Sequence, residues 1–262
     1  MAPRPTWKGF LRLSLVTVPV KAFPAISSGG EIRLNQLHAE CNQRVKYQKT
    51  CPEHGAISND QIVSGYEHSK GQYVVVQQEE LQKLRPERDG TIRIEGFLDA
   101  GEVDSIYHAG RAYYLLPNGA VGQKPYSLLF QSMTDDGVEA IAQVVLSGRE
   151  HLVLLRPYQR MLTMFFLTHQ KKVNSVAHYH EELEEHELSD EELALTKTLI
   201  GASRIAEFDY AKYEDDYVEQ LNRLIQAKIE GHEIVEVKDA EEPKILNLME
   251  ALKKSVAQAQ LG

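Results

Sequence analysis

Hydrophobic and polar residues alternate along much of the first 180 residues of the chain, as they do in half-buried β-strands. In the first such stretch, which ends at Phe23, Lys8 and Arg12 share one face with Phe10 and Ser14, and leucines occupy the other face. This pattern predicts one half-buried strand whose solvent face carries two cations.

Further stretches are rich in β-branched and aromatic residues and are bounded by Gly, Pro or Asn, which is typical of strands. We predict strands in GQYVVVQ, GTIRIEGFL, AYYLLP and EHLVLLRPY, and a strand pair in EIRLNQLHAE and RVKYQKT, joined near Asn42. The stretch SLLFQSMTDDGVEAIAQVVL mixes periods and predicts a short helix over 128–133 or a strand from Val138. Just before it, we interpret GAVGQK as a turn between strands. Many short strands at intervals of about ten residues predict a barrel or a sandwich.

After about residue 180 the pattern becomes helical. Ser189 and Glu192 form a capping box that predicts the start of a helix. The stretch YEDDYVEQLNRLIQAKIEG predicts a second helix that ends at Gly231, and a third helix is expected to begin near Pro243. Between these two helices, HEIVEVKDAEE predicts a strand followed by an acidic connection. The fold class is therefore α+β, mainly β, with a β domain over residues 1–180 and a helical region over residues 181–262.

Charge is distributed unevenly along the chain, whose net charge is −9. Residues 1–180 hold 20 Lys and Arg against 17 Asp and Glu, which gives +3, and residues 181–262 hold 9 against 21, which gives −12. A polyanion could bind the first part and be repelled by the second. The alternative is an ordinary β domain with a solvated acidic helical tail.

The sequence contains no run near the ~20 apolar residues that a membrane helix needs. The start, MAPRPTWKGF, lacks the apolar region of a signal peptide, so we expect a cytoplasmic protein. In a reducing compartment its two cysteines are expected to be thiols or metal ligands rather than a disulfide.

Both cysteines lie three residues from a histidine, in the pairs His38-x2-Cys41 and Cys51-x2-His54. Two such pairs supply the four ligands of a tetrahedral structural zinc. Nine residues separate the cysteines, and an extended stretch of that length spans about 30 Å. One ion can therefore bind both pairs only if the chain doubles back; otherwise a pair needs ligands from elsewhere, including another subunit. The alternative is that the thiols fill small apolar gaps and the histidines are solvated.

Signatures of several enzyme classes are missing, including G-x-S-x-G, G-x-G-x-x-G and the P-loop. The segment HYHEE places His178 and His180 on one face of a predicted strand. Catalysis by a metal there would need a third ligand and an open position in a cleft, so an exposed strand end is the simpler interpretation.

Basic residues on or beside the predicted strands could contact phosphates without reading bases. The candidate DNA-binding residues are Lys8, Arg12, Arg44, Lys46, Lys49, Arg149, Lys171 and Lys172. For any one of them taken alone, a solvated strand face is the simpler interpretation.

Seven segments, spread over roughly residues 5–232, resemble bacterial Ku proteins and follow in the order of that family. They are WKGFLRLSLVTVPVKAF, LHAECNQRVKYQKTCPEHG, YEHSKGQYVVV, IEGFLDAGEVDSIY, YYLLPNGAVGQKPYSLL, SGREHLVLLRP and FDYAKYEDDYVEQLNRLIQAKIEG. The Lys-rich tail of longer family members has no counterpart here beyond Lys253 and Lys254.

The resemblance implies a β-barrel core with an extended looped arm and a homodimer whose two arms close a ring. Such a ring threads onto double-stranded DNA ends without reading sequence and recruits DNA ligase D for non-homologous end joining. It implies no catalytic activity, no required cofactor and a nucleoid-associated location. The segment of Arg44, Lys46 and Lys49 falls where the family's arm begins, and Arg149 with Lys171 and Lys172 falls near the channel. Two alternatives from other classes are a zinc-dependent hydrolase and a zinc-stabilised domain that binds another protein.

Overall fold

The computed structural model describes residues 4–26, 32–84, 90–231 and 248–259. The described chain divides into two compact units. The first unit ends at Asn174. The second unit begins at Ser175 and also includes residues 32–34. Each unit is described by itself.

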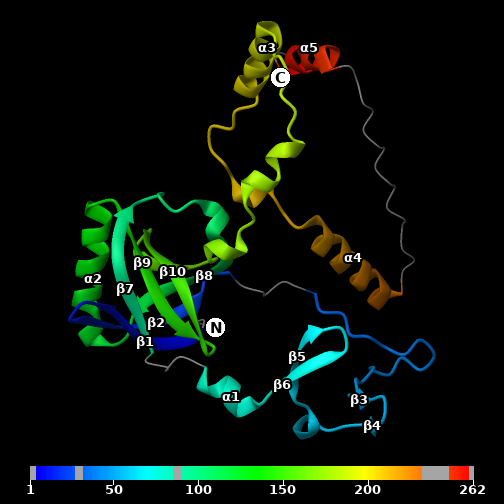
Figure 1. Cartoon of the computed structure of the whole chain (residues 1–262). Helices are drawn as coiled ribbons and strands as arrows, with labels where there is room; N and C mark the ends of the chain where they lie inside the picture. The colour runs from blue at the N-terminus through cyan, green and yellow to red at the C-terminus, as the bar shows by residue number, and fades with distance from the viewer. Residues whose placement is uncertain (1–3, 27–31, 85–89, 232–247, 260–262) are drawn as a thin grey trace. The chain divides into compact units, whose positions relative to one another are not determined.

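Seven strands of the first unit form a closed barrel in the order β1, β2, β8, β11, β10, β9 and β7 (Figure 1). Their bounds are β1 (Trp7–Leu13), β2 (Val16–Pro24), β7 (Thr91–Asp99), β8 (His108–Pro117), β9 (Val138–Leu146), β10 (Arg149–Tyr158) and β11 (Met161–Leu167). Neighbouring strands are antiparallel except β1 and β7, whose parallel pairing closes the barrel. The barrel prediction is confirmed, and with it the mainly β class; the sandwich alternative is wrong.

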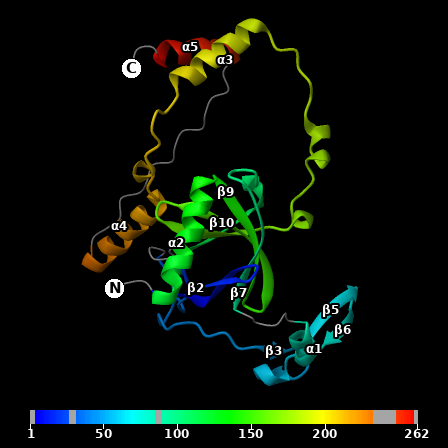
Figure 2. The same cartoon turned by 90° about the vertical axis from the view of Figure 1, so that its left-hand side faces the viewer.

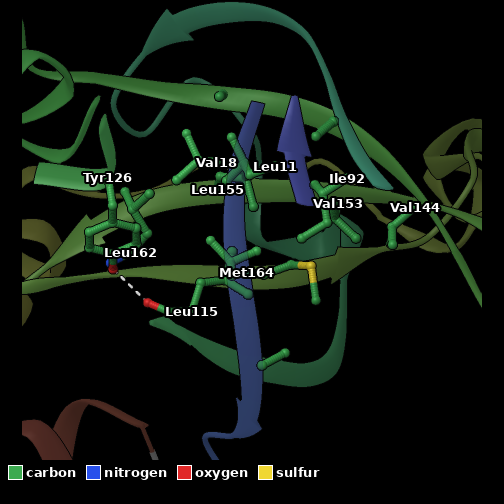
Figure 3. Close-up of a cluster of buried hydrophobic side chains, with 14 of the residues drawn as sticks. Leu11, Val18, Ile92, Leu115, Tyr126, Val144, Val153, Leu155, Leu162 and Met164 are labelled. Carbon is green, nitrogen blue, oxygen red and sulfur yellow. Dashed lines mark hydrogen bonds between the residues drawn. The ribbon is translucent and has the colours of Figure 1, made fainter. Parts of the chain in front are cut away.

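The barrel is filled by apolar side chains from alternate positions of its strands (Figure 3). On β10 these positions are Val153 and Leu155, and both side chains are 0% exposed. Each fully buried aliphatic side chain contributes about 1.5–3 kcal/mol relative to an exposed one. Where apolar and polar residues alternate in the sequence, their side chains thus point in turn into the packed interior and to the outside of the barrel.

The helix α2 (Ala120–Asp135) joins the end of β8 to the start of β9 and packs on the barrel (Figure 2). The hydroxyl of its buried Tyr126 donates to the Leu115 carbonyl at 2.5 Å and accepts from the Leu162 N–H at 2.7 Å. A Cβ on Gly122 would lie 2.8 Å from the Pro19 carbonyl oxygen, so only glycine lets the helix approach β2 this closely.

Three of the sequence predictions in this part of the chain need correction. The helix begins at Ala120, so the interpretation of GAVGQK as a turn between strands is wrong. The two alternatives offered for the next stretch both occur, since α2 includes 128–133 and β9 begins at Val138. The single strand expected up to Phe23 is a hairpin, because Ser14 adopts a left-handed φ of 52° and Leu15 in the turn is 98% exposed.

Residues 35–84 form a segment that we call the arm. It contains the hairpins β3 (Thr50–Cys51) with β4 (Gly55–Ala56) and β5 (Ser64–Ser69) with β6 (Gln72–Val76), followed by helix α1 (Gln78–Lys83). The predicted turn near Asn42 is confirmed, because Asn42 has a φ of 55° and Leu37 bridges to Arg44. The strand pair predicted on either side of it is wrong for the described residues, which form only this isolated bridge before β3 begins at Thr50. No residue of the arm is buried.

The second unit contains α3 (Asp190–Ala202), α4 (Asp216–Glu230) and α5 (Leu248–Ala259). The capping box at the start of α3 is confirmed, since the Ser189 hydroxyl accepts from the Glu192 N–H and the Glu192 carboxylate accepts from the Ser189 N–H. The end of α4 at Gly231 is confirmed by its left-handed φ of 76°. The predicted strand in HEIVEVKDAEE and a helix start near Pro243 lie outside the described residues. Among the helices that the structure describes, none is long and apolar enough to cross a membrane.

Candidate nucleic-acid interface

One group of predicted cations lies on the outer face of the barrel. Lys8 stands opposite Lys21 across β1 and β2, and Arg12 stands opposite Arg93 across β1 and β7. Arg93 donates to the Glu150 carboxylate at 2.8 Å. Because opposing residues in an antiparallel ladder are about 5 Å apart, Lys8 and Lys21 form a pair of like charges, which favours an anionic partner over plain solvation. Beside Arg12, the Glu150 carboxylate offsets the charge of Arg93.

A second cationic group lies at the end of the barrel away from α2, where β8 and β10 begin and β9 and β11 end. Arg111 continues the inward-facing row of Leu115, and His151 continues the inward-facing row of Val153. Both pack on Phe166: the Arg111 guanidinium lies 4.4 Å from the ring centroid, and the His151 ring lies 5.0 Å away at an interplanar angle of 62°. Gly110, next to Arg111, adopts a φ of 69°, and the register between β8 and β11 shifts here. The shift is a bulge near the start of β8, and it sets the direction of the Arg111 side chain.

The predicted Arg149 belongs to this group, which we call the open-end cluster: Arg111, Arg149, His151 and His169. The pKa of His151 is lowered mainly by burial, and further by the charges of Arg111, Arg149 and His169, whereas a hydrogen bond to Leu146 raises it. Among the described residues no carboxylate contributes to this shift. Burial first, and then the positive neighbours, therefore disfavour the charged form of the His151 ring, and a bound phosphate would oppose the effect of the neighbours.

Lys171 and Lys172 lie in a 3-10 turn, Gln170–Lys172, immediately after His169. Both are exposed. They extend the open-end cluster along the chain, although no contact joins them to Arg149. The structure thus places three of the eight predicted cations at or next to one end of the barrel and two on its outer face.

The remaining three cations, Arg44, Lys46 and Lys49, follow one extended segment of the arm. Arg44 and Lys46 share one side of that segment because they are two residues apart. The Lys49 ammonium donates to the Asn59 side-chain oxygen at 2.9 Å, so it is held toward its own hairpin.

The four predicted zinc ligands form two pairs at the tips of two turns. The His38 Nδ1 lies 3.2 Å from the Cys41 Sγ, and the Cys51 Sγ lies 3.5 Å from the His54 Nδ1. A tetrahedral zinc with one sulfur and one nitrogen ligand holds those atoms about 3.5 Å apart, so each pair fits half a site. In the described residues no three His, Cys, Asp or Glu side chains gather as a group that could hold a metal ion. A four-ligand site within a single chain stays a prediction, because in the described residues the ligands come together only two at a time.

The segment with His178 and His180 is not a strand, so the expectation that these side chains share a strand face is wrong. It forms two successive 3-10 turns, Val176–His178 and His180–Glu182, and both histidines are exposed. Four glutamates and no Lys or Arg lie between 181 and 185. Repulsion among these neighbouring carboxylates disfavours a regular strand. The geometry gives the hydrolase alternative no support.

Sequence reasoning missed the cations Lys21, Arg93 and Arg111 and the histidines His151 and His169. Lys21 and Arg93 become significant only through their partners across the ladder, and Arg111 and His151 only through the bulge and barrel closure. A signal was available for Lys21, because it continues the outer face of the first hairpin.

Comparison with known proteins agrees with this architecture. The family model for the Ku70/Ku80 beta-barrel domain matches residues 12–195. The non-homologous end joining protein Ku of Heliobacterium modesticaldum is 35% identical, over 99% of this chain and 94% of its own. The protein of the same name from Archaeoglobus fulgidus is 35% identical, over 97% of this chain and 98% of its own. The one from Bacillus subtilis is 32% identical, over 95% of this chain and 80% of its own. The SPOC domain of human PHD-finger protein 3 overlaps with a TM-score of 0.31 at 13% identity, over 63% of this chain and 95% of that one, which carries no argument.

The fold and the site define a seven-stranded β-barrel protein with an arm and several cationic surfaces. The chain belongs to the Ku family.

Proposed function

We propose that this protein binds the ends of double-stranded DNA, without reading sequence, as a ring-shaped homodimer. It then recruits DNA ligase D for non-homologous end joining in double-strand break repair, and it is not itself an enzyme. The observation that carries the proposal is the open-end cluster, which gathers cations from three separate segments where no described carboxylate faces His151.

The cationic groups suit phosphates rather than bases. Arg111, Arg149 and Lys8 stand on barrel strands, whose rigid spacing can follow a sugar–phosphate backbone. Base readout needs side chains that enter a groove, and sequence-independent binding needs only phosphate contacts. A ring that loads onto any broken end is expected to use phosphate contacts.

The arm supports the homodimer. Its exposed apolar side chains include Leu37, Tyr47, Tyr66, Tyr73, Val74 and Val75. Apolar side chains collected on a segment with no buried residue are typical of a surface that another chain covers. A second copy of this chain, whose arm carries the same surface, is the partner that we propose, and two arms joined in this way would close the ring.

Recruitment of DNA ligase D is assigned to residues 181–262, the helical region. Its α4 carries Val218, Leu221, Leu224 and Ile225 in one stripe that is only partly covered. The acidic surroundings of that stripe would keep DNA away from it and leave it to a protein partner.

The proposal is tested first with a linear duplex of about thirty base pairs that has free ends, against the same duplex capped by hairpin loops. We expect tight binding to the open duplex alone, because a closed ring needs an end to enter. Equal binding to both would mean an open cationic surface and no ring. Binding to neither at low salt would remove the DNA function altogether.

Charge removal then maps the surface. The variants Arg44→Gln, Lys46→Gln, Lys171→Gln and Lys172→Gln should each weaken binding and reduce its salt dependence. The matched control is Lys197→Gln, an exposed lysine of α3 in the acidic helical region, which should bind like the wild type. End joining by DNA ligase D should rise when the protein is added, and deleting residues 216–262 should abolish the rise but keep the end binding.

A further inference from the structure

A groove opens at the end of the barrel that lies opposite the open-end cluster. Its volume is about 530 Å³, within the range of about 300–1,000 Å³ that is usual for ligand-binding clefts. It is bounded by the end of β1, the start of β2, the end of β7, the start of β9 and the second half of α2. Ten of the twelve residues that line it are apolar, so apolar groups are what it would receive. We call it the α2 groove.

The packing of α2 explains where the groove forms. At Gly122 the helix approaches β2 so closely that a Cβ would meet the Pro19 carbonyl oxygen at 2.8 Å, and the Tyr126 hydroxyl bonds the backbone of β8 and β11. The first half of α2 is thus fixed to the barrel. The groove lies along the second half, where residues of β1 and β7 also reach this end of the barrel.

The floor of the groove consists of buried side chains and its rim of exposed ones. Leu11 and Met133 are each 1% exposed and belong to the barrel core (Figure 3). At the mouth, Val16, Phe97 and Leu128 are between 43% and 61% exposed. The apolar surface therefore continues from the core outward to the solvent.

A β-bulge directs Phe97 to this mouth. Ile94 stands opposite Ala142 and Phe97 stands opposite Ala140, and both alanines are 0% exposed in the barrel interior. Side chains of a regular strand change sides at every residue, so positions three apart would point to opposite sides. The register shift between Ile94 and Gly96 instead places Phe97 on the inner side, where its ring forms a wall on which an occupant can pack.

The mouth of the groove is negatively charged. Among the described residues that line it, Asp136 at the C-cap of α2 is the only ionisable one, and Asp135 stands beside it. The last turn of α2 contains no basic residue, and the helix dipole is negative at this end as well. Lys124 and Arg12 are close in sequence to lining residues but do not line the groove. Within the described parts of the chain, no ion pair joins either aspartate to a Lys or Arg.

These features select the chemistry of an occupant. A small apolar molecule would fill the groove but leave its rim, and the neighbouring Leu15, in water. An anionic lipid surface would be repelled by Asp135 and Asp136. A protein segment with apolar side chains and a neighbouring cation would fill the groove, cover the rim and meet the carboxylates.

We propose that the α2 groove docks a segment of a partner protein, whose apolar side chains enter the groove while a lysine or arginine meets Asp136. An amphipathic helix with apolar residues at i, i+3, i+4 and i+7 is the form that suits such a groove. The inference goes beyond the proposed function, because ligase recruitment is assigned to residues 181–262 and the groove belongs to the barrel. It does not depend on that function.

The groove leaves the open-end cluster free. Val138 lines the groove at the start of β9, and the open-end cluster lies where β9 ends. The nine residues of β9 span roughly 25–30 Å. A partner in the groove and a DNA phosphate backbone at the open-end cluster would therefore bind at the same time.

The test selects peptides from a random library displayed on phage, with the immobilised full-length protein as the target. Each selected peptide is synthesised, and its affinity is measured by fluorescence anisotropy. Leu128→Arg puts a cation at the mouth, and the fold should tolerate it because Leu128 is exposed. Val121→Arg is the matched control, because Val121 is exposed on the same helix but does not line the groove.

We expect the selected peptides to share apolar residues at helical spacing and at least one Lys or Arg. They should bind the wild type and Val121→Arg equally, and Leu128→Arg about tenfold or more weakly, because an apolar contact at the centre of the interface is lost. Peptides that bind all three proteins alike would overturn the inference. A library from which no peptide is enriched would overturn it as well.

Asp136→Lys tests the charge separately. It should weaken the cationic peptides about threefold to tenfold and reduce the salt dependence of their binding. A selection repeated on this variant should yield peptides with Asp or Glu in place of the cation. Glu187→Lys, an exposed site outside the barrel, is the matched control. Unchanged affinity for Asp136→Lys would contradict the proposed cation.

Other occupants are distinguished in the same preparations. Sedimentation of Leu128→Arg should match that of the wild type, and a changed oligomeric state would make the groove an interface between copies. Binding of the neutral dye Nile red that Leu128→Arg removes, without any selected peptide, would make it a small-ligand pocket. Duplex-end binding should be unchanged in Leu128→Arg, and peptides should bind the DNA-loaded protein equally well. Displacement of the peptides by DNA would contradict the separation of the two sites, whereas a failure of duplex-end binding in the wild type would concern the proposed function alone.

Discussion

The barrel and the arm use apolar residues in opposite ways. In the barrel, a cluster that includes Leu155, Val153 and Tyr126 is almost fully buried. In the arm, valines, leucines and tyrosines stand on short hairpins and none of them is buried. The barrel therefore has its stabilising contacts within one chain, whereas the arm presents surfaces that a partner or a ligand would complete. Mutations in the barrel should accordingly change the stability of the chain, and mutations in the arm should change its assembly with a partner.

The sharpest contrast is expected from truncating one side chain in each region. Leu155→Ala should lower the free energy of unfolding by about 2–5 kcal/mol, because it leaves a cavity in a core that is closed on all sides. Tyr47→Ala in the arm should change it by less than about 0.5 kcal/mol for the isolated chain, since Tyr47 is 82% exposed. Urea denaturation followed by circular dichroism at low protein concentration measures both. Equal losses would mean that the arm is part of the barrel's cooperative unit.

A smaller loss is expected at the hydroxyl that links α2 to the barrel. Burial raises the pKa of Tyr126, so its hydroxyl stays protonated and donates to Leu115 while it accepts from the Leu162 N–H. Tyr126→Phe should cost about 1–3 kcal/mol, because both backbone groups lose a buried partner. The same denaturation measurement tests it, and Tyr66→Phe in the arm is the matched control. An unchanged midpoint would show that water replaces the hydroxyl.

Removing charge from the open-end cluster should leave stability almost unchanged and weaken DNA binding. We expect the double variant Arg111→Gln/Arg149→Gln to bind linear duplex about tenfold less tightly, with the salt slope reduced by about 0.9 for each lost phosphate contact. Fluorescence anisotropy at several salt concentrations measures both quantities, with Lys197→Gln as the control. If affinity falls with an unchanged slope, these arginines do not contact phosphates.

The smallest effect is expected from the titration of His151. Its pKa is lowered in the folded protein, so below the ordinary value of about 6.5 the unfolded chain binds more protons and stability falls as the pH decreases. Above that value this contribution is fully retained. His151→Gln should therefore flatten the stability profile below about pH 6.5. In the wild type, bound DNA should raise the pKa of His151, so binding should strengthen on acidification more than in the variant.

Much of the barrel could be predicted from the sequence of its strands. The strands of GTIRIEGFL, AYYLLP and EHLVLLRPY were identified from their β-branched and aromatic residues and from the Gly, Pro or Asn that bound them, and all three belong to the barrel. The strand β11 was missed, because six of its seven residues, MLTMFFL, are apolar and the pattern has no period of two. Helix α2 was missed at its start because Pro125 and two glycines obscure it, although tertiary contacts of Tyr126 and Gly122 stabilise it there.

The candidate site was harder to predict than the fold. Residues on one strand, such as Lys8 and Arg12, could be grouped from spacing alone. The open-end cluster joins residues from three segments between 111 and 169, and only the closure of the barrel brings them together. The candidate metal ligands were chosen by their spacing within each pair, and whether one chain could complete such a site depends on the direction of the segment between them.

The parallel pairing of β1 with β7 also has a consequence for synthesis. β1 and β2 leave the ribosome before the other barrel strands, yet β7, the remaining neighbour of β1, is separated from them by the 66 residues from 25 to 90, and β8, the remaining neighbour of β2, comes later still. At about 5–20 residues per second, the first hairpin waits roughly 3–13 s for β7, with Leu11, Val18 and Val20 unprotected. The arm, which contributes nothing buried, thus adds to the delay before the barrel can close, which also requires β8 to β11. During that delay the nascent chain is most exposed to aggregation, and lengthening the arm would prolong it.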